Sequence, residues 1–150
     1  MTRILSGDEV ADRLLGEFPD LAVEREHEAV LVDASMIVEV SRFLHADHDL
    51  DLAALIHLTA VDYVDYFEIV YRITSYRRNH GALLKTRAYD RVEPIVPSVT
   101  TIWSSATFQE REVFDLMGVR FDGHPELKRI VLWEGFDGHP LRKDFLLQRP

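Results

Sequence analysis

The sequence predicts an α+β fold: a two-layer domain in which helices pack on a mixed β-sheet, followed by an extended Gly/Pro-rich C-terminal segment. Two observations support the domain. Helical and strand-like hydrophobic periods follow one another in the first half of the chain, and two strand patterns joined by a turn occupy its middle. A third observation defines the segment, because residues 118–150 contain four of the seven glycines and three of the six prolines. We therefore divide the chain into residues 1–117 and 118–150, and expect the second part to belong to the same domain without folding independently.

The N-terminal part contains two predicted helices around one short strand. Ser6 and Glu9 have the Ser-x-x-Glu spacing of a capping box, and apolar residues then recur at helical spacing until Pro19. The run "AVLVDA" predicts a strand around Val30–Val32. A second apolar stripe predicts a helix over residues 34–45.

Three strands are predicted in the middle of the chain. Residues 52–61 are nearly continuously apolar, which predicts a central strand that is buried on both faces. Residues 67–74 alternate between apolar and polar side chains, which is typical of a strand with one face on a core. The turn residues Asn-His-Gly at 79–81 are followed by "ALLKTRAY", which predicts the returning strand of a hairpin.

A third helix is predicted before the C-terminal segment. Thr107 and Glu110 have the spacing of a second capping box, and Gly118 is placed to end the helix in the left-handed conformation. The side chains expected on its buried face, with the charges elsewhere, are Phe108, Val113, Phe114 and Met117. After Gly118, only "RIVLW" at residues 129–133 looks like a strand.

Composition excludes several classes of function. The chain has 150 residues, the length of one globular domain, and it contains no cysteine. The absence of cysteine excludes disulfides, a thiolate zinc site, a thiol nucleophile and a Cys-held iron–sulfur cluster in this chain. A net charge of −9 argues against nucleic-acid binding. Since there is no leader pattern and no apolar run long enough to span a bilayer, we expect a soluble, cytosolic protein.

The charge is unevenly distributed. The first part of the chain is strongly acidic, whereas residues 69–109 carry an excess of basic side chains. The basic residues considered are Arg72, Arg77, Arg78, Lys85 and Arg87. They indicate either a surface for an acidic partner or a solvated sheet face that lies opposite the chain's own acidic half, and we favour the second interpretation.

The pentapeptide FDGHP occurs twice, at residues 121–125 and 136–140. In each copy the glycine tolerates positive φ, the aspartate can form an Asx turn and the residue before proline is driven towards an extended backbone. The repeat therefore predicts a turn. Two matched histidines also permit a metal site with a nearby acidic residue, although no third ligand stands at a characteristic spacing.

Three carboxylates on the third predicted helix permit acid/base chemistry. Glu110 and Glu112 are two residues apart, so on a helix they point in different directions. Arg111 and Asp115 have the i, i+4 spacing of an ordinary ion pair. Structural pairing is therefore the simpler hypothesis, and we expect these charges to orient the helix against the C-terminal segment or a partner.

The segment "EREVFDLMGVRFDGHPELKRIVLWEGFDGHPLRKDF", residues 110–145, strongly resembles the 30-kDa subunit, also called the C subunit, of proton-pumping NADH:quinone oxidoreductase, respiratory complex I. The resemblance extends more weakly upstream through "LTAVDY", "RNH" and "VPSVTTIW". It implies a set of signature and interface residues: Glu110, Arg111, Glu112, Asp115, Gly123, His124, Pro125, Lys128, Arg129, Gly138, His139, Pro140, Arg142, Lys143 and Asp144.

The resemblance also implies a role within a larger complex. The chain would belong to the peripheral arm and carry no catalytic residue, cofactor or metal, while other subunits hold NADH, FMN, the iron–sulfur clusters and the quinone. Its expected partners are the large, 49-kDa-like quinone-site subunit and other peripheral-arm subunits, with residues 118–150 as a docking segment. No nucleic acid is involved. The complex would lie on the cytoplasmic side of a bacterial cell membrane, which this chain would reach only through the complex.

Two alternatives stay open at the level of sequence. The first is the equivalent subunit of a related membrane-bound, hydrogenase-type complex. The second comes from another class, a free-standing metalloenzyme that uses His124, His139 and an acidic residue.

Overall fold

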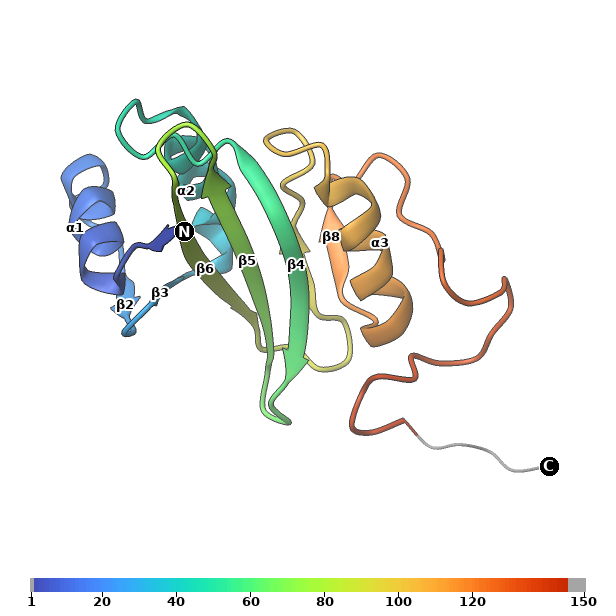
Figure 1. Cartoon of the computed structure of the whole chain (residues 1–150). Helices are drawn as coiled ribbons and strands as arrows, with labels where there is room; N and C mark the ends of the chain where they lie inside the picture. The colour runs from blue at the N-terminus through green and yellow to red at the C-terminus, as the bar shows by residue number, and fades with distance from the viewer. Residues whose placement is uncertain (1, 146–150) are drawn as a thin grey trace.

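The computed structural model describes residues 2–145 and shows an α+β fold built on a mixed six-stranded sheet (Figure 1). The helices are α1 (Gly7–Glu17), α2 (Ile37–Ala46, after a 3₁₀ turn at Ala34–Met36) and α3 (Ala106–Met117). The strands of the large sheet are β1 (Arg3–Ile4), β2 (Val23–Arg25), β3 (Ala29–Val32), β4 (Ala54–Asp62), β5 (Phe67–Ser75) and β6 (His80–Ala88). A second sheet pairs β7 (Ile95–Pro97) with β8 (Arg120–Asp122).

The large sheet is mixed, as the sequence predicts. Its order is β2-β3-β6-β5-β4, and β1 also pairs with β6. β1 and β3 run parallel to β6, whereas the β2–β3, β4–β5 and β5–β6 pairs are antiparallel. The predicted β5–β6 hairpin is confirmed, and its turn places Asn79 at φ 53°, in the left-handed region that asparagine tolerates.

One face of the sheet packs against the helices. The alternation in β5 buries Phe67, Ile69, Tyr71 and Ile73 completely on this face. These side chains form a single core cluster with apolar residues of α1, α2 and α3. The predicted one-sided packing is therefore confirmed. Each fully buried apolar side chain of this size contributes about 1.5–3 kcal/mol.

The opposite face carries Lys85 and Arg87 on β6, while Arg77 lies in the turn after β5. Lys85 forms ion pairs with Glu26 and Glu68, and Arg87 also pairs with Glu68. Arg77 pairs with Asp51 in the same way. Three of the five basic residues therefore pair with acidic residues of the chain itself, as the interpretation favoured from sequence expects. Arg72 and Arg78 form no ion pair within residues 2–145, and Arg78 binds His48.

The prediction of a buried central strand at residues 52–61 is wrong. β4 lies at the edge of the sheet, and its Ile56 is 43% exposed. The residues around α3 explain why an edge strand is so apolar. Ser105 Oγ donates to the Leu55 carbonyl (2.9 Å) and Gln109 Oε1 accepts from the Leu58 amide (2.6 Å), so α3 covers the open edge of β4.

Three details of the α3 prediction are also wrong. The N-cap is Ser105, without a side-chain hydrogen bond, and Thr107 lies inside the first turn. Phe108 is 62% exposed, whereas Glu110 and Asp115 are completely buried, so part of the buried face is charged. The expected left-handed end at Gly118 is confirmed, with φ 77°. Residues 129–133 form no strand and instead wrap around a side chain of α3.

The two predicted capping boxes provide a matched pair of substitutions. At α1 the box is complete, because Ser6 Oγ accepts from the Glu9 amide (3.1 Å) and Glu9 Oε2 accepts from the Ser6 amide (3.0 Å). We expect Ser6→Ala to lower the free energy of unfolding by about 1 kcal/mol, measured by urea denaturation. Thr107→Ala removes no cap and serves as the control. An equal loss in both variants would contradict the assignment of the caps.

Candidate docking surface

The functional side chains converge on α3, which carries a buried carboxylate on each of two sides. Glu110 faces the sheet side, where Oε2 accepts from Ser98 Oγ (2.7 Å) and Oε1 accepts from the Val99 amide (2.9 Å). The Ser98 hydroxyl also lies 2.9 Å from Thr100 Oγ1. Glu110 thereby fastens the loop that follows β7 to the middle of α3.

The environment of Glu110 favours a protonated carboxyl. Burial raises its pKa to about 7, and the two hydrogen bonds from Ser98 and Val99 offset only part of that rise. Tyr71 shares this part of the core, and its hydroxyl has no hydrogen-bond partner among the described residues. Burial, together with the negative charge of Glu110, raises the pKa of Tyr71 well above its ordinary value.

Asp115 is the second buried carboxylate, and it holds the C-terminal segment. Its Oδ2 accepts from three consecutive amides, those of Ile130 (3.0 Å), Val131 (2.7 Å) and Leu132 (2.8 Å). Its Oδ1 accepts from Arg129 Nη1 at 2.6 Å. Burial alone raises the pKa of Asp115, but the three amides and the guanidinium outweigh it and hold the pKa below its usual range.

Two arginines complete the attachment of the segment. Arg129 donates from Nη2 to the carbonyls of Phe136 (2.9 Å) and Gly138 (2.8 Å), besides its bonds to Asp115. Arg111 donates to the carbonyls of Lys128 (3.1 Å) and Arg129 (3.0 Å). The predicted Arg111–Asp115 ion pair is therefore wrong. Both side chains bind the C-terminal segment, because its carbonyls and amides need partners where it crosses α3.

The two histidines of the repeat bind carbonyls near opposite ends of α3. His124 Nδ1 accepts from the Glu126 amide (2.9 Å), so its Nε2 carries the proton that is donated to the Thr107 carbonyl (2.8 Å). His139 Nδ1 donates to the Asp115 carbonyl (2.9 Å). A Cβ atom at Gly118 would lie 2.7 Å from the His139 ring, so glycine is required there for space as well as for its φ.

The repeated pentapeptide forms a bend twice but is used differently in each copy. Gly123 and Gly138 both adopt positive φ, at 86° and 93°, as predicted. In the first copy the His124 amide closes the turn on the Phe121 carbonyl (3.2 Å). In the second copy the carbonyls of Phe136 and Gly138 face Arg129. The two copies therefore share the positive φ of the glycine, while within residues 2–145 this turn hydrogen bond forms only in the first copy and the external partners differ.

The last signature residues lie against the end of the large sheet. Arg142 donates to the Arg91 carbonyl (2.7 Å) and pairs with Asp144. Asp62, at the end of β4, accepts from Arg91 (2.7 Å) and from the Lys143 amide (3.0 Å). The Arg91 guanidinium holds the pKa of Asp62 well below its usual range.

Sequence reasoning missed Asp62, Arg91 and Ser98 as members of this constellation. Two of them fall within stretches that carried the weaker resemblance, Asp62 in "LTAVDY" and Ser98 in "VPSVTTIW". The side chains of two other signature residues take no part in this constellation. Glu112 is exposed and forms no ion pair within residues 2–145, and Lys128 is exposed and pairs only with Glu126 in that range.

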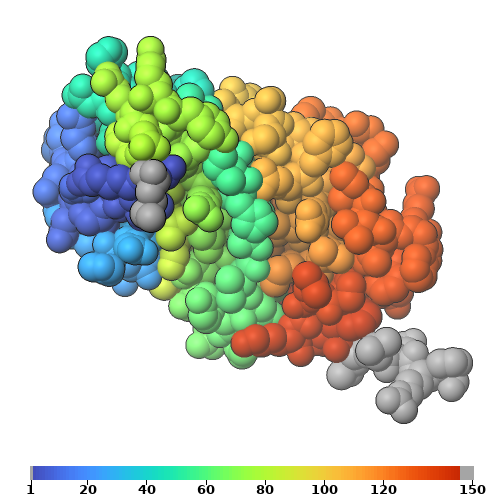
Figure 2. Space-filling model, viewed as in Figure 1, coloured from blue at the N-terminus to red at the C-terminus, as the bar shows by residue number. Residues whose placement is uncertain are grey.

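The attached segment exposes large apolar side chains among charged ones such as Glu126, Lys128 and Glu134. Figure 2 shows residues 123–145 covering one end of the molecule. The exposed large apolar side chains there are Phe108 on α3 and Ile130, Val131, Trp133 and Leu141 on the segment. Trp133, 68% exposed, is braced edge-on against Phe136 with ring centroids 5.0 Å apart. Large exposed apolar side chains within a polar surround are typical of a surface that packs on another protein.

The family model of the respiratory-chain NADH dehydrogenase 30-kDa subunit matches residues 30–150 of this chain. The chain belongs to this family. It is 44% identical over 135 residues to the NADH-quinone oxidoreductase C subunit of Moorella thermoacetica, and the match covers 87% of this chain and 89% of the relative. It is 40% identical over 147 residues to the corresponding protein of Roseiflexus castenholzii, where the match covers 93% and 84%.

Family members differ in length. The match to the NADH-quinone oxidoreductase C subunit of Erythrobacter litoralis is 40% identical over 139 residues, but this chain spans only 54% of that relative. Among solved structures, the fold is similar to a chain of the membrane-bound sulfane sulfur reductase, an archaeal respiratory membrane complex, with a TM-score of 0.74 and 27% identity. That match covers 94% of this chain and 86% of the other.

Two further observations concern the described part of this family member. None of its helices within residues 2–145 is both long and apolar enough to cross a membrane. In the same range, no three side chains of the types His, Cys, Asp and Glu gather as a metal site would require.

The Asp115 cluster predicts a large cost of neutralisation. We expect Asp115→Asn to lower the free energy of unfolding by about 3 kcal/mol, since the substitution leaves Arg129 and several amide donors without their charged acceptor. Glu112→Gln, a neighbouring exposed carboxylate, is the control and should stay within about 0.5 kcal/mol. Guanidinium unfolding of both variants makes the comparison, and similar values would show that the Asp115 cluster contributes little.

Glu110 predicts that the stability of the fold falls as the pH rises. Because its folded-state pKa of about 7 exceeds the reference value of 4.5, its stabilising contribution is complete below pH 4.5 and is lost as the pH rises through 7. We expect Glu110→Gln to flatten this decline, so the stability difference between the two proteins changes by up to about 3 kcal/mol between pH 4.5 and about pH 8. Parallel pH profiles of the unfolding free energy would contradict the assignment.

Proposed function

We propose that the chain is a non-catalytic structural and assembly subunit that docks on the large quinone-site subunit of its complex. Its membership in the 30-kDa subunit family, with relatives named as the C subunit of NADH-quinone oxidoreductase, supports assignment to that oxidoreductase. In this proposal other subunits carry NADH, FMN, the iron–sulfur clusters and the quinone. The chain supports electron transfer from NADH to quinone, coupled to proton translocation, and reaches the cytoplasmic side of the membrane only through the complex.

One observation carries the docking proposal. The charged signature residues Arg111, Asp115 and Arg129 all form hydrogen bonds between α3 and the C-terminal segment. They therefore shape the segment, and its exposed apolar side chains are left to contact the partner. Trp133 and Leu141, 68% and 59% exposed, are the strongest candidates, since large side chains dominate the energy of protein interfaces.

A second candidate is the equivalent subunit of a related respiratory complex. The specific observation in its favour is the structural similarity to a chain of the archaeal membrane-bound sulfane sulfur reductase. The two candidates differ in their electron donor, so genes for a flavin- and NADH-binding module beside the gene of this chain would favour the oxidoreductase. Nothing comparable favours the metalloenzyme alternative, since His124 and His139 bind carbonyls near opposite ends of α3.

Capture of the quinone-site subunit of the same complex tests the docking proposal. We expect Trp133→Ser with Leu141→Ser to weaken capture by tenfold or more, about 1.4 kcal/mol, without lowering the melting temperature measured by circular dichroism. Ile56→Ser with Tyr76→Ser removes exposed apolar side chains elsewhere on the molecule and is the matched control. Unchanged capture by the Trp133 and Leu141 variant would refute docking through this segment.

The non-catalytic part of the proposal has its own test. We expect the purified chain to show no flavin or iron–sulfur absorption and no quinone reduction with NADH, because it contains no cysteine and no dinucleotide-binding motif. Reproducible NADH-dependent turnover by the pure chain would refute it.

A further inference from the structure

Val64, at the tip of the β4–β5 hairpin, has a strained backbone conformation. Val64 has φ 73°, in the left-handed region where Cβ branching is most unfavourable. Its amide donates to Asp62 Oδ1 (2.8 Å), and the Tyr63 amide donates to the Tyr66 carbonyl (2.9 Å), which together hold the turn. Backbone strain of this kind is concentrated at sites of function, so the position calls for a functional explanation.

The strained turn lies within an exposed apolar surface. This hairpin-tip patch consists of Tyr63, Val64, Tyr66, Tyr89 and Val92. Val64 is 57% exposed and Val92 is 87% exposed. The tyrosine rings pack against one another, with centroids 5.4 Å apart for Tyr63 and Tyr66 and 5.6 Å apart for Tyr66 and Tyr89. Tyrosine-rich apolar surfaces that are rigid before binding are typical of protein interfaces.

Carboxylates surround the hairpin-tip patch. Asp65, Asp90 and Glu93 are exposed, and none of them pairs with a cation of the described chain. Four cations are nearby. Arg87 pairs with Glu68 and lies over the Tyr66 ring, 4.2 Å from its centroid, while Arg91 and Arg142 both pair with Asp144. Lys143, whose amide binds Asp62, is exposed. The three rim carboxylates nevertheless have no ion-pair partner within residues 2–145.

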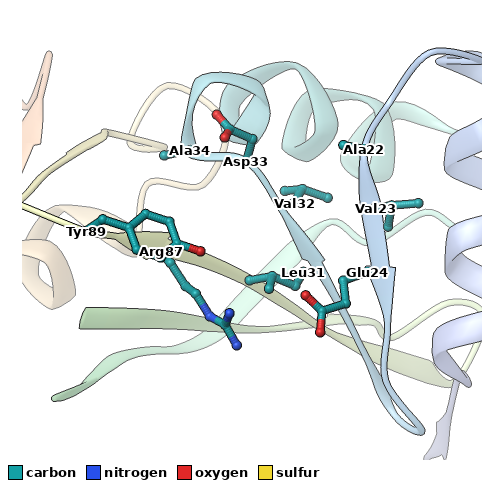
Figure 3. Close-up of a pocket in the computed structure, with 9 residues that line it drawn as sticks. All are labelled: Ala22, Val23, Glu24, Leu31, Val32, Asp33, Ala34, Arg87 and Tyr89. Atoms are coloured by element: carbon teal, nitrogen blue, oxygen red, sulfur yellow. The ribbon is translucent and has the colours of Figure 1, made fainter. Parts of the chain in front are cut away.

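A groove adjoins the patch (Figure 3), and the side chain of Arg87 lines it together with acidic and apolar residues. The groove has a volume of about 530 Å³, and Tyr89 lies both in its wall and in the hairpin-tip patch. Glu24 and Asp33 supply two more exposed carboxylates to its lining.

The patch is also continuous with the docking segment. Asp62 accepts from the Val64 amide at the hairpin tip and from the Lys143 amide of the segment (3.0 Å). One buried carboxylate thus fixes the two surfaces relative to each other, and Figure 2 shows the hairpin tip beside the end of the segment.

The geometry points to a second docking surface, in which the hairpin-tip patch and its acidic rim bind a basic surface of the quinone-site subunit. The occupant follows from charge complementarity. A second copy of this chain is disfavoured, because each copy carries a net charge of −9. An anionic membrane surface is disfavoured for the same reason. The inference rests on the proposed function for the identity of the complex, but not on docking through the C-terminal segment.

Association kinetics with the quinone-site subunit of the same complex provide the test. We expect the triple variant Asp65→Lys, Asp90→Lys and Glu93→Lys to reduce the association rate about tenfold at ~0.05 M salt, with the difference shrinking at ~0.5 M salt. The control variant Glu17→Lys, Asp20→Lys and Glu39→Lys makes the same change of charge at exposed, unpaired carboxylates of the α1 and α2 side. A loss of equal size in the control would overturn the inference.

A single substitution at Val64 tests whether its strained backbone serves binding or only the fold. Asparagine tolerates left-handed φ, so we expect Val64→Asn to leave the melting temperature unchanged or raised while accelerating dissociation at least threefold. A lowered melting temperature with unchanged dissociation would show that Val64 serves only the fold and would overturn the inference.

The outcomes distinguish this inference from the docking of the C-terminal segment. If only the Trp133 and Leu141 variant loses capture, the second docking surface is overturned. If only the hairpin variants lose capture, the second docking surface is supported and docking through the C-terminal segment is refuted. Unchanged capture in both would overturn both. Self-association of the chain in sedimentation, or binding to vesicles of anionic phospholipid that is abolished by Val64→Asn, would assign the patch to another occupant and overturn the inference.

Discussion

The buried carboxylate of Asp115 is the interaction on which the C-terminal part of the structure depends. Residues 123–145 contain no helix or strand, so their backbone groups need partners from elsewhere. Asp115 provides the acceptor for three of these amides and fixes Arg129, whose guanidinium then binds two carbonyls further along the segment. Breaking such a cluster costs more than forming it contributes, because a buried charge would be left uncompensated. The cluster therefore specifies the path of the segment more than it adds net stability.

Glu110 shows how strongly the number of donors decides the behaviour of a buried carboxyl. Glu110 and Asp115 lie on the same helix and are both completely buried. Glu110 receives one hydroxyl and one amide, so burial dominates and raises its pKa. Asp115 receives three amides and a guanidinium, which outweigh burial and lower its pKa. The second arrangement therefore keeps the carboxylate charged at neutral pH, whereas the first favours the protonated form much more strongly than an ordinary glutamate does.

Local patterns in the sequence were sufficient to predict most of the fold but few of the contacts in the candidate site. The capping box at Ser6, the β5–β6 hairpin and the left-handed end at Gly118 each depend on neighbouring residues, and all three are confirmed. The edge position of β4 could not be predicted, because its apolar character reflects α3, which follows about fifty residues later. The Thr107 capping box failed for a related reason, since Glu110 bonds to Ser98 and Val99 instead of the helix start.

The two FDGHP copies show where such predictions end. Glycine and proline at fixed positions determine the bend, and both copies bend as predicted, with positive φ at Gly123 and Gly138. The partner of each histidine is set by the part of α3 that the bend reaches, at the Thr107 carbonyl in one copy and the Asp115 carbonyl in the other. Identical pentapeptides thus attach two points of one irregular segment near opposite ends of one helix. This spacing leaves residues 126–137 as a loop that is held at both ends and by Asp115 between them, and it is this loop that presents Trp133 outward.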